Sequence, residues 1–470
     1  MQFNHNPVIR NLWNQSRLSF QLFRWVSIVN PTPPLTTNLK PIDLAFDLDE
    51  LLEMDGSENK KKGWEEIWPI SPAPIESRRP HWFTWLLRLF FPSKAMFILL
   101  GTTTVSLNIG HPAKIFELDI DSGSDLTWVQ CDAPCTGCTE PREHLYRPNN
   151  NLLQCKDLLC TAFHSPASHP CETTDDQCDY EVKYADHGSS LGVLVKDYFP
   201  LKFTNGSLLS LHLAFGCGYD QKYFGPVTPA TAGVIGLGNG KVSILSQLSR
   251  LGLTRNVVGH CLSGRGGGFL FFGDDLSVHN PWHFHRDNNL MIFIFRKRCS
   301  CGPAELVFDG KATSVKGLDM IFDSGSSYNY FNSQAYQAIV TLVRNDLKGK
   351  PLKDATEDQS LPICWKGRKP FKFVRDAKNY FKPLSLSFTN AKNVQRQLSP
   401  QTYLIVTKHG NVCLGILNGT EVGLGNLNII GDITLQDKML IYDNENQRIG
   451  WAPANCNTLP KSRTIAIIAR

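Results

Sequence analysis

The strongest constraint on this chain is a short motif that occurs twice. Residues 116–128 read FELDIDSGSDLTW and residues 318–331 read LDMIFDSGSSYNYF, so two apolar runs end in Asp-Ser-Gly-Ser with Asp121 and Asp323 in register. A little over one hundred residues after each motif comes a second shared stretch, AGVIGLG in the first half and LNIIGD in the second. Because the same pair of stretches recurs in the same order, we expect two duplicated lobes.

The motif also suggests a chemistry. Gly123 and Gly325 allow the backbone to turn sharply and approach closely after each aspartate, and the serine hydroxyls can orient the carboxylates. If the loops meet at a two-fold axis, Asp121 and Asp323 lie side by side. Two like charges about 4 Å apart repel by roughly 4 kcal/mol at an effective dielectric near 20, so the pair should hold one proton over a wide acidic range. One carboxylate then acts as general base on water, and the other acts as general acid.

The pattern of short apolar runs separated by turn residues predicts a β protein between about residues 100 and 458. Short runs of Val, Ile, Leu, Phe and Tyr alternate with Gly, Pro, Asn and Asp, as in TVSLNIG and GFLFFGDD. Only a few stretches, chiefly VSILSQLSRLG and SQAYQAIVTLVRNDL, have helical periodicity. The formal net charge of +5 over 470 residues is small, so charge gives no reason to expect nucleic-acid binding.

Cysteine usage predicts disulfides and an oxidising compartment. None of the 14 cysteines precedes Cys131, and seven fall between Cys131 and Cys178. Since seven is odd, one of them must pair elsewhere, with Cys217, Cys261 or Cys456 as the options. The sequons at Asn205 and Asn418 agree with secretion and are candidates for glycosylation.

The first 99 residues differ from the rest. The first forty contain no acidic residue, as in transit peptides, and RRPHWFTWLLRLFFPSKA resembles a signal sequence displaced inward. We expect most of residues 1–95 to be removed or disordered, with nothing before Thr103 that resembles a strand of the first lobe. The predicted location is the secretory pathway, extracellular or vacuolar, with a plastid or a membrane anchored through the N-terminal segment as alternatives.

Over residues 103–458 the sequence resembles the pepsin-like aspartic proteases, and more narrowly their plant nucellin-like branch. The matching text includes LDIDSGSDLTWVQCDAPC, CDYEVKYADHGSSLGVLV, AFGCGYDQ, IFDSGSSY and NVCLGILNGTEVGLGNLNIIGDI. The resemblance implies an all-β bilobal fold of two β-barrel lobes related by a pseudo-two-fold axis, with a few short helices. It also implies an endopeptidase that cleaves extended polypeptides at acidic pH, acts as a monomer, and needs neither metal nor organic cofactor.

The resemblance further assigns roles to individual residues. The catalytic pair would be Asp121 and Asp323, each followed by a tight glycine. Tyr184 would be the tyrosine of the flap, a hairpin that closes over substrate, and Trp128 would support it. The remaining implied residues are the carboxylate-orienting Ser124 and Ser326, the glycines Gly123 and Gly325, and the bridge between Cys364 and Cys413. Ser122 and Ser324 stand where the family usually has threonine, which keeps the hydroxyl.

One segment departs from the family. Residues 283–301, HFHRDNNLMIFIFRKRCSC, match nothing expected and suggest an error in the gene model. We therefore divide the chain into an extension (1–99), a first lobe with the flap (100–275), an aberrant linker (276–301), a second lobe (302–458) and a tail (459–470).

The sequence allows three other interpretations, namely a binding module, a metal site and a degradation signal. The chain could be a catalytically impaired pepsin-like protein that acts as a binding or inhibitor module. The spacing in CDAPCTGC resembles an iron–sulfur motif, and His279, His283 and His285 could mimic a zinc site. A phosphorylation-dependent degradation signal would need a second serine three residues after the glycine, where Leu126 and Tyr328 stand.

Overall fold

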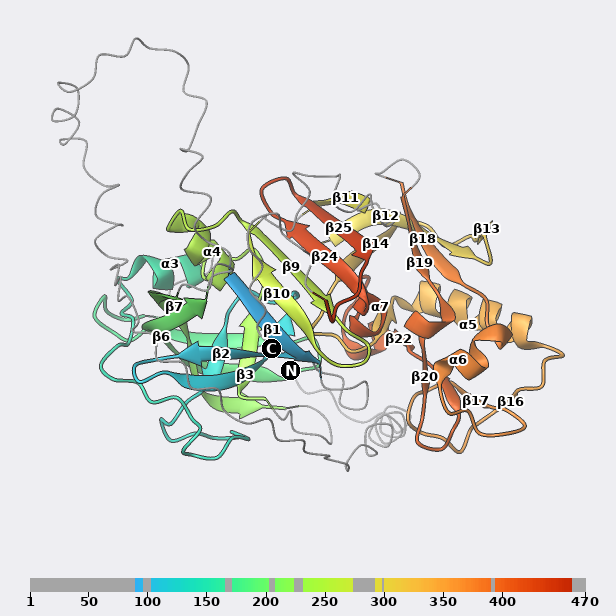
Figure 1. Ribbon diagram of the computed structural model, residues 1–470, viewed down its shortest axis with the longest axis horizontal. Helices are drawn as coiled ribbons and strands as arrows, with labels where there is room; N and C mark the ends of the chain where they lie inside the picture. Colours follow the sequence, from blue (N-terminus) through green and yellow to red (C-terminus); the bar gives the residue numbers. More distant parts are fainter. Residues whose placement is uncertain are drawn as a thin grey trace, which may run out of the picture.

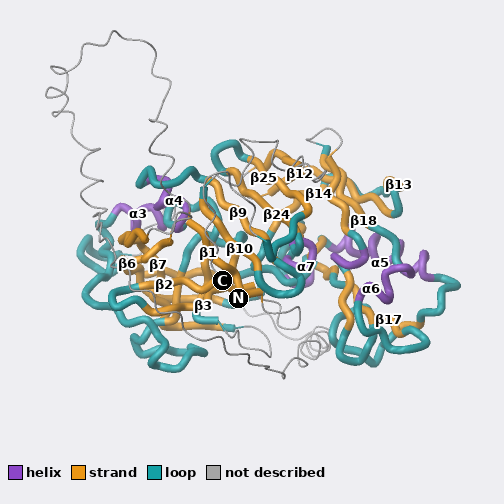
Figure 2. Tube along the Cα trace, viewed as in Figure 1, coloured by secondary structure: helices purple, strands orange, loops and turns teal. Residues whose placement is uncertain are grey.

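The computed structural model describes residues 89–95, 103–164, 171–202, 208–223, 231–273, 292–297, 300–389 and 394–458. Strands dominate this part of the chain, and helices are few (Figure 2). The strands of the first half lie on one side, in blue and green, and those of the second half lie on the other, in yellow and orange (Figure 1). The expected bilobal, all-β pepsin-like fold is confirmed.

The first lobe is built around β3 (Lys114–Asp121). Its even-numbered residues from Phe116 to Ile120 are buried in the core, and its odd-numbered residues face the opposite side, as alternation along a strand requires. The other strands are β2 (Thr103–Ile109), β4 (Trp128–Gln130), β5 (Asp179–Lys183), β6 (Ser189–Lys202), β7 (Leu208–Lys222) and β8 (Gly233–Gly236), with helices α3 (Leu158–His164) and α4 (Ile244–Arg250).

The second lobe repeats this plan around β14 (Leu318–Phe322). Its sheet also contains β12 (Ser300–Phe308), β13 (Lys311–Ala312), β15 (Asn329–Phe331), β18 (Leu384–Phe388), β19 (Val394–Leu398), β22 (Ile416–Asn418) and β23 (Asn428–Ile430). A separate four-stranded sheet consists of β16 (Lys353–Asp354), β17 (Cys364–Lys366), β21 (Val412–Leu414) and β20 (Leu404–Val406). The short helices are α6 (Val374–Ala377), α7 (Asp432–Leu435), η4 (Lys378–Tyr380), η5 (Pro400–Thr402) and η6 (Thr420–Val422).

The longest helix of the second lobe, α5 (Ser333–Leu347), follows from local sequence. The Asn332 side chain caps it by accepting a hydrogen bond from the Ala335 amide at 3.0 Å. Its buried side chains recur at intervals of three or four residues, which gives one apolar face toward the core.

The duplication predicted from the motif is visible in the strand pairing. In the first lobe β3 runs parallel to β8, and β4 pairs antiparallel with β8 and parallel with β7. In the second lobe β14 runs parallel to β23, and β15 pairs antiparallel with β23 and parallel with β22. Trp128 opposite Val234 thus corresponds to Tyr330 opposite Ile429. Each aspartate therefore ends the central strand of an equivalent structure.

A six-stranded antiparallel arrangement joins the lobes. Its order is β1 (Leu89–Ala95), β10 (Gly268–Phe272), β9 (Val257–Leu262), β24 (Lys438–Asp443), β25 (Arg448–Pro453) and β11 (Ile292–Lys297). Three strands come from each half of the chain, and β9 pairs with β24 at the centre. Figure 1 shows these strands between the two lobes.

Two expectations need correction here. Residues 89–95, which we assigned to an extension without strand character, form β1 and pair with both β10 and β2. Part of the aberrant linker forms β11, which pairs with β25 and continues into β12. In both cases the reason is that an edge of the central sheet accepts any extended segment that presents backbone N–H and C=O groups. The rest of both segments, including the three histidines, lies outside the described residues.

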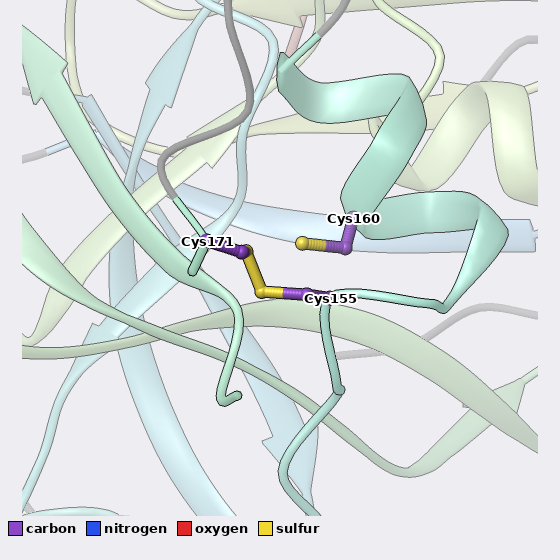
Figure 3. A group of neighbouring side chains, drawn as sticks. All are labelled: Cys155, Cys160 and Cys171. Atoms are coloured by element: carbon purple, nitrogen blue, oxygen red, sulfur yellow. A yellow bond between two sulfur atoms is a disulfide. The ribbon is translucent and has the colours of Figure 1, made fainter. Parts of the chain in front are cut away.

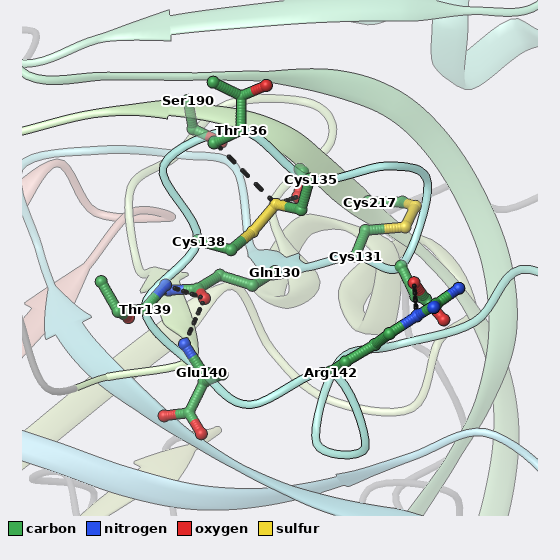
Figure 4. Close-up of a disulfide and its surroundings, with 12 residues drawn as sticks. Gln130, Cys131, Cys135, Thr136, Cys138, Thr139, Glu140, Arg142, Ser190 and Cys217 are labelled. Atoms are coloured by element: carbon green, nitrogen blue, oxygen red, sulfur yellow. Dashed lines mark hydrogen bonds and ion pairs between the residues drawn. A yellow bond between two sulfur atoms is a disulfide. The ribbon is translucent and has the colours of Figure 1, made fainter.

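The disulfides agree with the sequence argument. The odd member of the first cysteine group is Cys131, which pairs with Cys217, and the bridge between Cys364 and Cys413 is present. The other bridges join Cys135 to Cys138, Cys155 to Cys171, Cys160 to Cys178, and Cys261 to Cys456. Figure 4 shows the two bridges that the cysteines of CDAPCTGC form, from Cys131 to Cys217 and from Cys135 to Cys138. Because its three cysteines all form disulfides, this motif does not fit an iron–sulfur cluster.

Candidate active site

The ends of β3 and β14 bring Asp121 and Asp323 into contact across the lobe interface. The charge of Asp323 and a hydrogen bond with it are both among the causes that raise the pKa of Asp121. A Cβ atom on Gly123 would lie 2.8 Å from Asp323 Oδ1, and one on Gly325 would lie 2.5 Å from Asp121 Oδ1. Real Cβ atoms do not come so close to oxygen, so each loop needs glycine to let the other loop's carboxylate approach.

Each carboxylate is held in the same way. Asp121 Oδ1 accepts from the Gly123 amide at 2.7 Å, and its Oδ2 accepts from the Ser124 hydroxyl at 2.5 Å. The corresponding bonds to Asp323 come from the Gly325 amide at 2.9 Å and from the Ser326 hydroxyl at 2.7 Å. These paired bonds fix the orientation of both carboxylates.

Ser122 and Ser324 join the two loops through reciprocal hydrogen bonds. The Ser122 hydroxyl donates to the Phe322 carbonyl at 3.1 Å, and the Ser324 hydroxyl donates to the Ile120 carbonyl at 2.8 Å. Each amide also donates to the other serine's hydroxyl, at 3.1 and 3.0 Å. A serine in place of threonine therefore keeps the hydroxyl that these hydrogen bonds between the two loops need.

The electrostatics of the pair favour a shared proton. Burial, followed by the neighbouring charge of Asp323, raises the pKa of Asp121 to about 7, against the hydrogen bonds from Ser124 and Gly123. Asp121 is only 8% exposed. At acidic pH the pair therefore retains a proton, which is what one general acid beside one general base requires.

The flap tyrosine lies close to the dyad, as expected. Tyr184 lies in the turn between β5 and β6, where its amide donates to the Gly188 carbonyl at 2.9 Å. Its phenol oxygen accepts from the Trp128 indole at 2.6 Å. Burial and then the charge of Asp121 raise the pKa of Tyr184, so the phenol stays neutral near the two carboxylates. The structure thus brings all eight predicted dyad and flap residues together.

Sequence analysis missed a buried polar pair beneath the dyad. The Tyr442 hydroxyl donates to Ser122 Oγ at 3.1 Å and lies 3.4 Å from His260 Nε2. His260 has no exposed surface, and burial lowers its pKa to about 4. Both residues lie on central strands that otherwise appear as ordinary apolar runs, so only the strand pairing reveals their place.

Other candidate sites fit less well. Asn418 is buried, and its side-chain nitrogen donates to Glu421 Oε1 at 2.8 Å. This nitrogen is not available for a glycan in the folded chain, so our expectation for Asn418 finds no support; Asn205 lies outside the described residues. A cavity of about 640 Å³ lies between β13 and α5, beside Lys311 and Thr341, and none of the residues that line it belongs to the dyad motifs.

Within the described residues, three groups of side chains have metal-ligand spacing, and each contains cysteines that are already in disulfides. Figure 3 shows one of them, in which Cys160 lies beside the bridge between Cys155 and Cys171. A disulfide sulfur has no thiolate to offer a metal, so these groups do not fit a metal site. In the part of the chain that the structure describes, no helix is long and apolar enough to cross a membrane.

Known proteins resemble this chain in sequence and in fold. A bilobal β fold that carries one Asp-Ser-Gly loop per lobe defines a class, and the chain belongs to it: it is a member of the pepsin-like aspartic proteinase family. The family models described as xylanase inhibitor N-terminal and xylanase inhibitor C-terminal match residues 104–274 and 303–453.

Among named relatives, an aspartic proteinase of Oryza sativa subsp. japonica is 41% identical over 404 residues, which cover 82% of this chain and 97% of the relative. The aspartic proteinase nepenthesin-1 of Nepenthes gracilis is 26% identical and covers 76% of this chain and 78% of its own length. The crystal structure of conglutin gamma from lupine seeds has a TM-score of 0.61 at 16% identity, covering 82% of this chain and 100% of its own. The narrower nucellin-like assignment stays a prediction.

Proposed function

We propose that this protein is an aspartic endopeptidase that hydrolyses peptide bonds in extended polypeptides at acidic pH. The observation that carries the proposal is the reciprocal geometry of the dyad, in which each loop glycine is required by the other loop's carboxylate. Only a site selected for contact between the two carboxyl groups needs that arrangement, because unrelated turn aspartates would tolerate a Cβ atom at these positions.

The dyad residues support a mechanism in which water is the nucleophile. The ionised carboxylate takes a proton from a water molecule, and the oxygen of this water attacks the scissile carbonyl carbon. The protonated carboxyl group gives its proton to the carbonyl oxygen, so that a neutral geminal diol forms. In the second step the diol gives one proton to the carboxylate that is now ionised. The other carboxyl group, which is now protonated, gives its proton to the leaving nitrogen, and the C–N bond breaks. The flap hairpin β5–β6 can add backbone hydrogen bonds to a substrate held as a strand.

The test is cleavage of a denatured protein and of a mixed peptide library by the purified chain, between mildly and strongly acidic pH. We expect cleavage that declines as the pH rises through about 7, where Asp121 loses its proton. Variants Asp121→Asn and Asp323→Asn, purified in the same way, control for contaminating peptidases. If the parent releases no more peptides than these variants, the proposal is wrong.

A second function deserves the same experiment. The family models that match this chain are described as xylanase inhibitor domains, which favours a binding module on the same fold. In that case the parent would cleave nothing, and it would bind a protein partner equally well with Asp121 intact or replaced by Asn. The geometry of the dyad makes us prefer the endopeptidase.

We also propose that the protein matures in the secretory pathway and acts as a monomer. The six disulfides within the described residues support an oxidising compartment. Peptide mapping without reduction, after thiol blocking in the native tissue, should recover these pairs. Recovery of fully reduced cysteines would exclude the secretory pathway, and N-terminal sequencing of the same sample would locate the mature start.

A further inference from the structure

The second lobe carries a strongly basic segment that the proposed peptidase chemistry does not use. Residues 366–382 read KGRKPFKFVRDAKNYFK. Seven cations stand against one anion, Asp376, which gives +6, whereas the whole chain has a formal net charge of +5. The cations are also regularly spaced, because every third residue from Lys366 to Lys378 is lysine or arginine. Charge that is balanced over the rest of the chain is therefore concentrated in one short stretch.

This basic segment lies at the end of the second lobe. It follows β17 and contains α6 and η4, and α6 packs beside β20. The Phe371 amide donates to the Gly410 carbonyl at 2.9 Å, so the turn that carries the exposed Lys408 lies next to the segment. Figure 1 shows α6 and β17 at the end of this lobe that is farther from β3. A partner bound here would therefore lie away from Asp121 at the end of β3.

Most cations of the basic segment have no ionic partner. Lys366 pairs with Glu357 at 2.6 Å, and Lys382 pairs with Asp309 at 3.3 Å. Within the described part of the chain, the other five are exposed and form no ion pair: Arg368, Lys369, Lys372, Arg375 and Lys378. The one carboxylate of the segment, Asp376, accepts from two backbone amides there. Five neighbouring like charges without a counterion from the protein favour an anion from outside.

An exposed aromatic ring lies among these cations. Phe373 is 53% exposed, and the guanidinium carbon of Arg375 lies 4.3 Å from its ring centroid. No other large hydrophobic residue of the basic segment is exposed. A single ring offers too little apolar surface to hold the segment in a bilayer, which requires an apolar face. It is enough to pack against one ring of a bound ligand.

We propose that the basic segment, with the turn at Lys408, is a docking surface for an acidic polysaccharide whose sugar rings carry carboxylates. The regularly spaced cations would pair with carboxylates along the polymer, and arginine can bind both oxygens of one carboxylate. Phe373 would pack against a sugar ring. This inference goes beyond the endopeptidase function and does not depend on it.

The choice of a polysaccharide rests on the proposed secretory pathway. The six disulfides within the described residues favour an oxidising compartment. Anionic lipids, in contrast, are concentrated in the cytoplasmic leaflet of membranes. A carboxylated polymer outside the cytosol therefore fits both the charge of the segment and its single exposed ring.

The experiment measures binding of the purified chain to polygalacturonate by titration calorimetry at about pH 6, where carboxylates, lysine and arginine are charged. The methyl ester of the same polymer keeps the sugar rings without the charge, and inorganic polyphosphate has the charge without the rings. Phosphatidylcholine vesicles that contain phosphatidylserine test for a membrane. We expect binding to polygalacturonate and none to the methyl ester or the vesicles.

A triple variant removes three of the unpaired cations, namely Lys369→Gln, Lys372→Gln and Lys378→Gln. Each exposed ion pair changes a binding constant by about two- to fivefold, so the affinity for polygalacturonate should fall about 10- to 100-fold. The matched control makes the same change in net charge on the first lobe, with Lys114→Gln, Lys156→Gln and Lys241→Gln. We expect this control to bind as the parent does.

Phe373→Ser tests the sugar ring separately from the charge. Affinity for polygalacturonate should fall about fivefold, because the exposed half of the ring is no longer buried on binding, and affinity for polyphosphate should not change. If polygalacturonate binding is unaffected, the surface binds polyanions by charge alone and the polysaccharide assignment is wrong.

The remaining outcomes decide the proposal without any measurement of turnover. Equal binding of the methyl ester, equal losses in the two triple variants, or binding to the vesicles in place of polygalacturonate would each overturn it. Should the triple variant fail to fold, the parent protein decides. Its affinity for polygalacturonate must fall steeply between about 50 and 200 mM salt, as exchange of counterions requires, and an affinity that stays constant contradicts the docking surface.

Discussion

The two lobes hold their aspartates with the same bonds but cover them differently. Seven residues after Asp121 stands Trp128, whose indole donates to the flap tyrosine at 2.6 Å. Seven residues after Asp323 stands Tyr330, on the equivalent strand and opposite the equivalent residue of the neighbouring strand. Burial, then Tyr328 and then Asp186 at the tip of the flap, raises the pKa of Tyr330.

This difference indicates how a duplicated structure becomes directional. The lobe that carries the hairpin β5–β6 buries its aspartate beneath Tyr184. Among the described residues, the other lobe approaches the tip of this hairpin, where a Cβ atom on Gly423 would lie 3.6 Å from His187 Cε1. The carboxyl groups are equivalent in their local bonds and unequal in their surroundings. Like groups in unlike surroundings can separate the roles of acid and base.

The largest expected effect tests whether the lobes are equivalent at the dyad. Asp121→Asn and Asp323→Asn should each lower kcat by about 10²- to 10⁴-fold, because neither dyad could then supply both an acid and a base. The melting temperature should not fall, since each change removes one of two repelling groups. Initial rates on one good peptide, with a thermal melt of each variant, give the answer. A variant of either lobe with parental turnover would show that its aspartate is not catalytic.

The next effect compares how the lobes are cross-linked. Replacing Cys131 and Cys217 with alanine opens a loop with a sequence separation of 86, and replacing Cys364 and Cys413 opens one of 49. Loop entropy predicts a loss of about 4 kcal/mol in the free energy of unfolding for either pair. The matched control is Cys135 with Cys138, separation 3, for which the same relation gives about 2 kcal/mol.

Urea unfolding in an Asp121→Asn background, which avoids self-digestion, measures these three losses. The loop-length explanation is wrong if removal of the short bridge lowers the free energy of unfolding as much as removal of either long bridge. It also fails if one lobe tolerates the loss of its long bridge and the other does not.

A third effect concerns pH and the second lobe. Asp432 stands at the position equivalent to Leu237 of the first lobe, and it accepts from Thr103 of β2 at 3.1 Å across the interface. Burial raises the pKa of Asp432 to about 6, against hydrogen bonds from Gln436 and Thr103. A raised folded-state pKa gives stability that is fully present below about 3.8 and is lost as the pH rises through 6.

The pKa values of Asp119 and Asp121 are also raised, to about 7, so the stability that these two residues contribute is likewise lost as the pH rises through 7. Asp358 acts oppositely: burial would raise its pKa, but hydrogen bonds from Ser360, Thr407 and Asn411 lower it, so its contribution is lost below about pH 3.8. We therefore expect maximal stability near pH 4. Asp432→Asn should remove about 3 kcal/mol of the change between pH 4 and 8, from about two pKa units. Unfolding free energies at both pH values that fall equally in parent and variant would contradict this assignment.

The sequence predicted the dyad because its signals are local and repeated. Asp121, Asp323 and their glycines can be found without any knowledge of tertiary structure, since a tight turn after a carboxylate has a fixed residue pattern. The polar pair Tyr442 and His260 could not be found in this way. Its members are 182 residues apart, and only the pairing of β9 with β24 brings them together.

Errors had the same origin. Residues 89–95 carry few of the alternating positions that identify a strand, yet β1 forms because the neighbouring strands supply its hydrogen bonds. The Asn418 sequon gave no sign that its amide nitrogen would be used by Glu421. Asp119 is visible in LDIDSG, but the sequence does not show that its Oδ1 lacks a hydrogen-bond donor, because this depends on how the described residues pack around it.

The smallest effect returns to the difference between Trp128 and Tyr330. Tyr184→Phe removes the hydrogen bond from the Trp128 indole and leaves the ring of the flap in place. A neutral hydrogen bond contributes about 1 kcal/mol, so kcat/KM should fall about fivefold, with more of the change in KM than in kcat, because the flap positions substrate and exchanges no proton. Tyr330→Phe is the matched change in the lobe without the flap, and we expect a change of less than about twofold. Steady-state kinetics on one peptide compare the two variants directly. If Tyr330→Phe is the more damaging change, the second lobe does more than hold its aspartate, and the flap is not the source of the asymmetry.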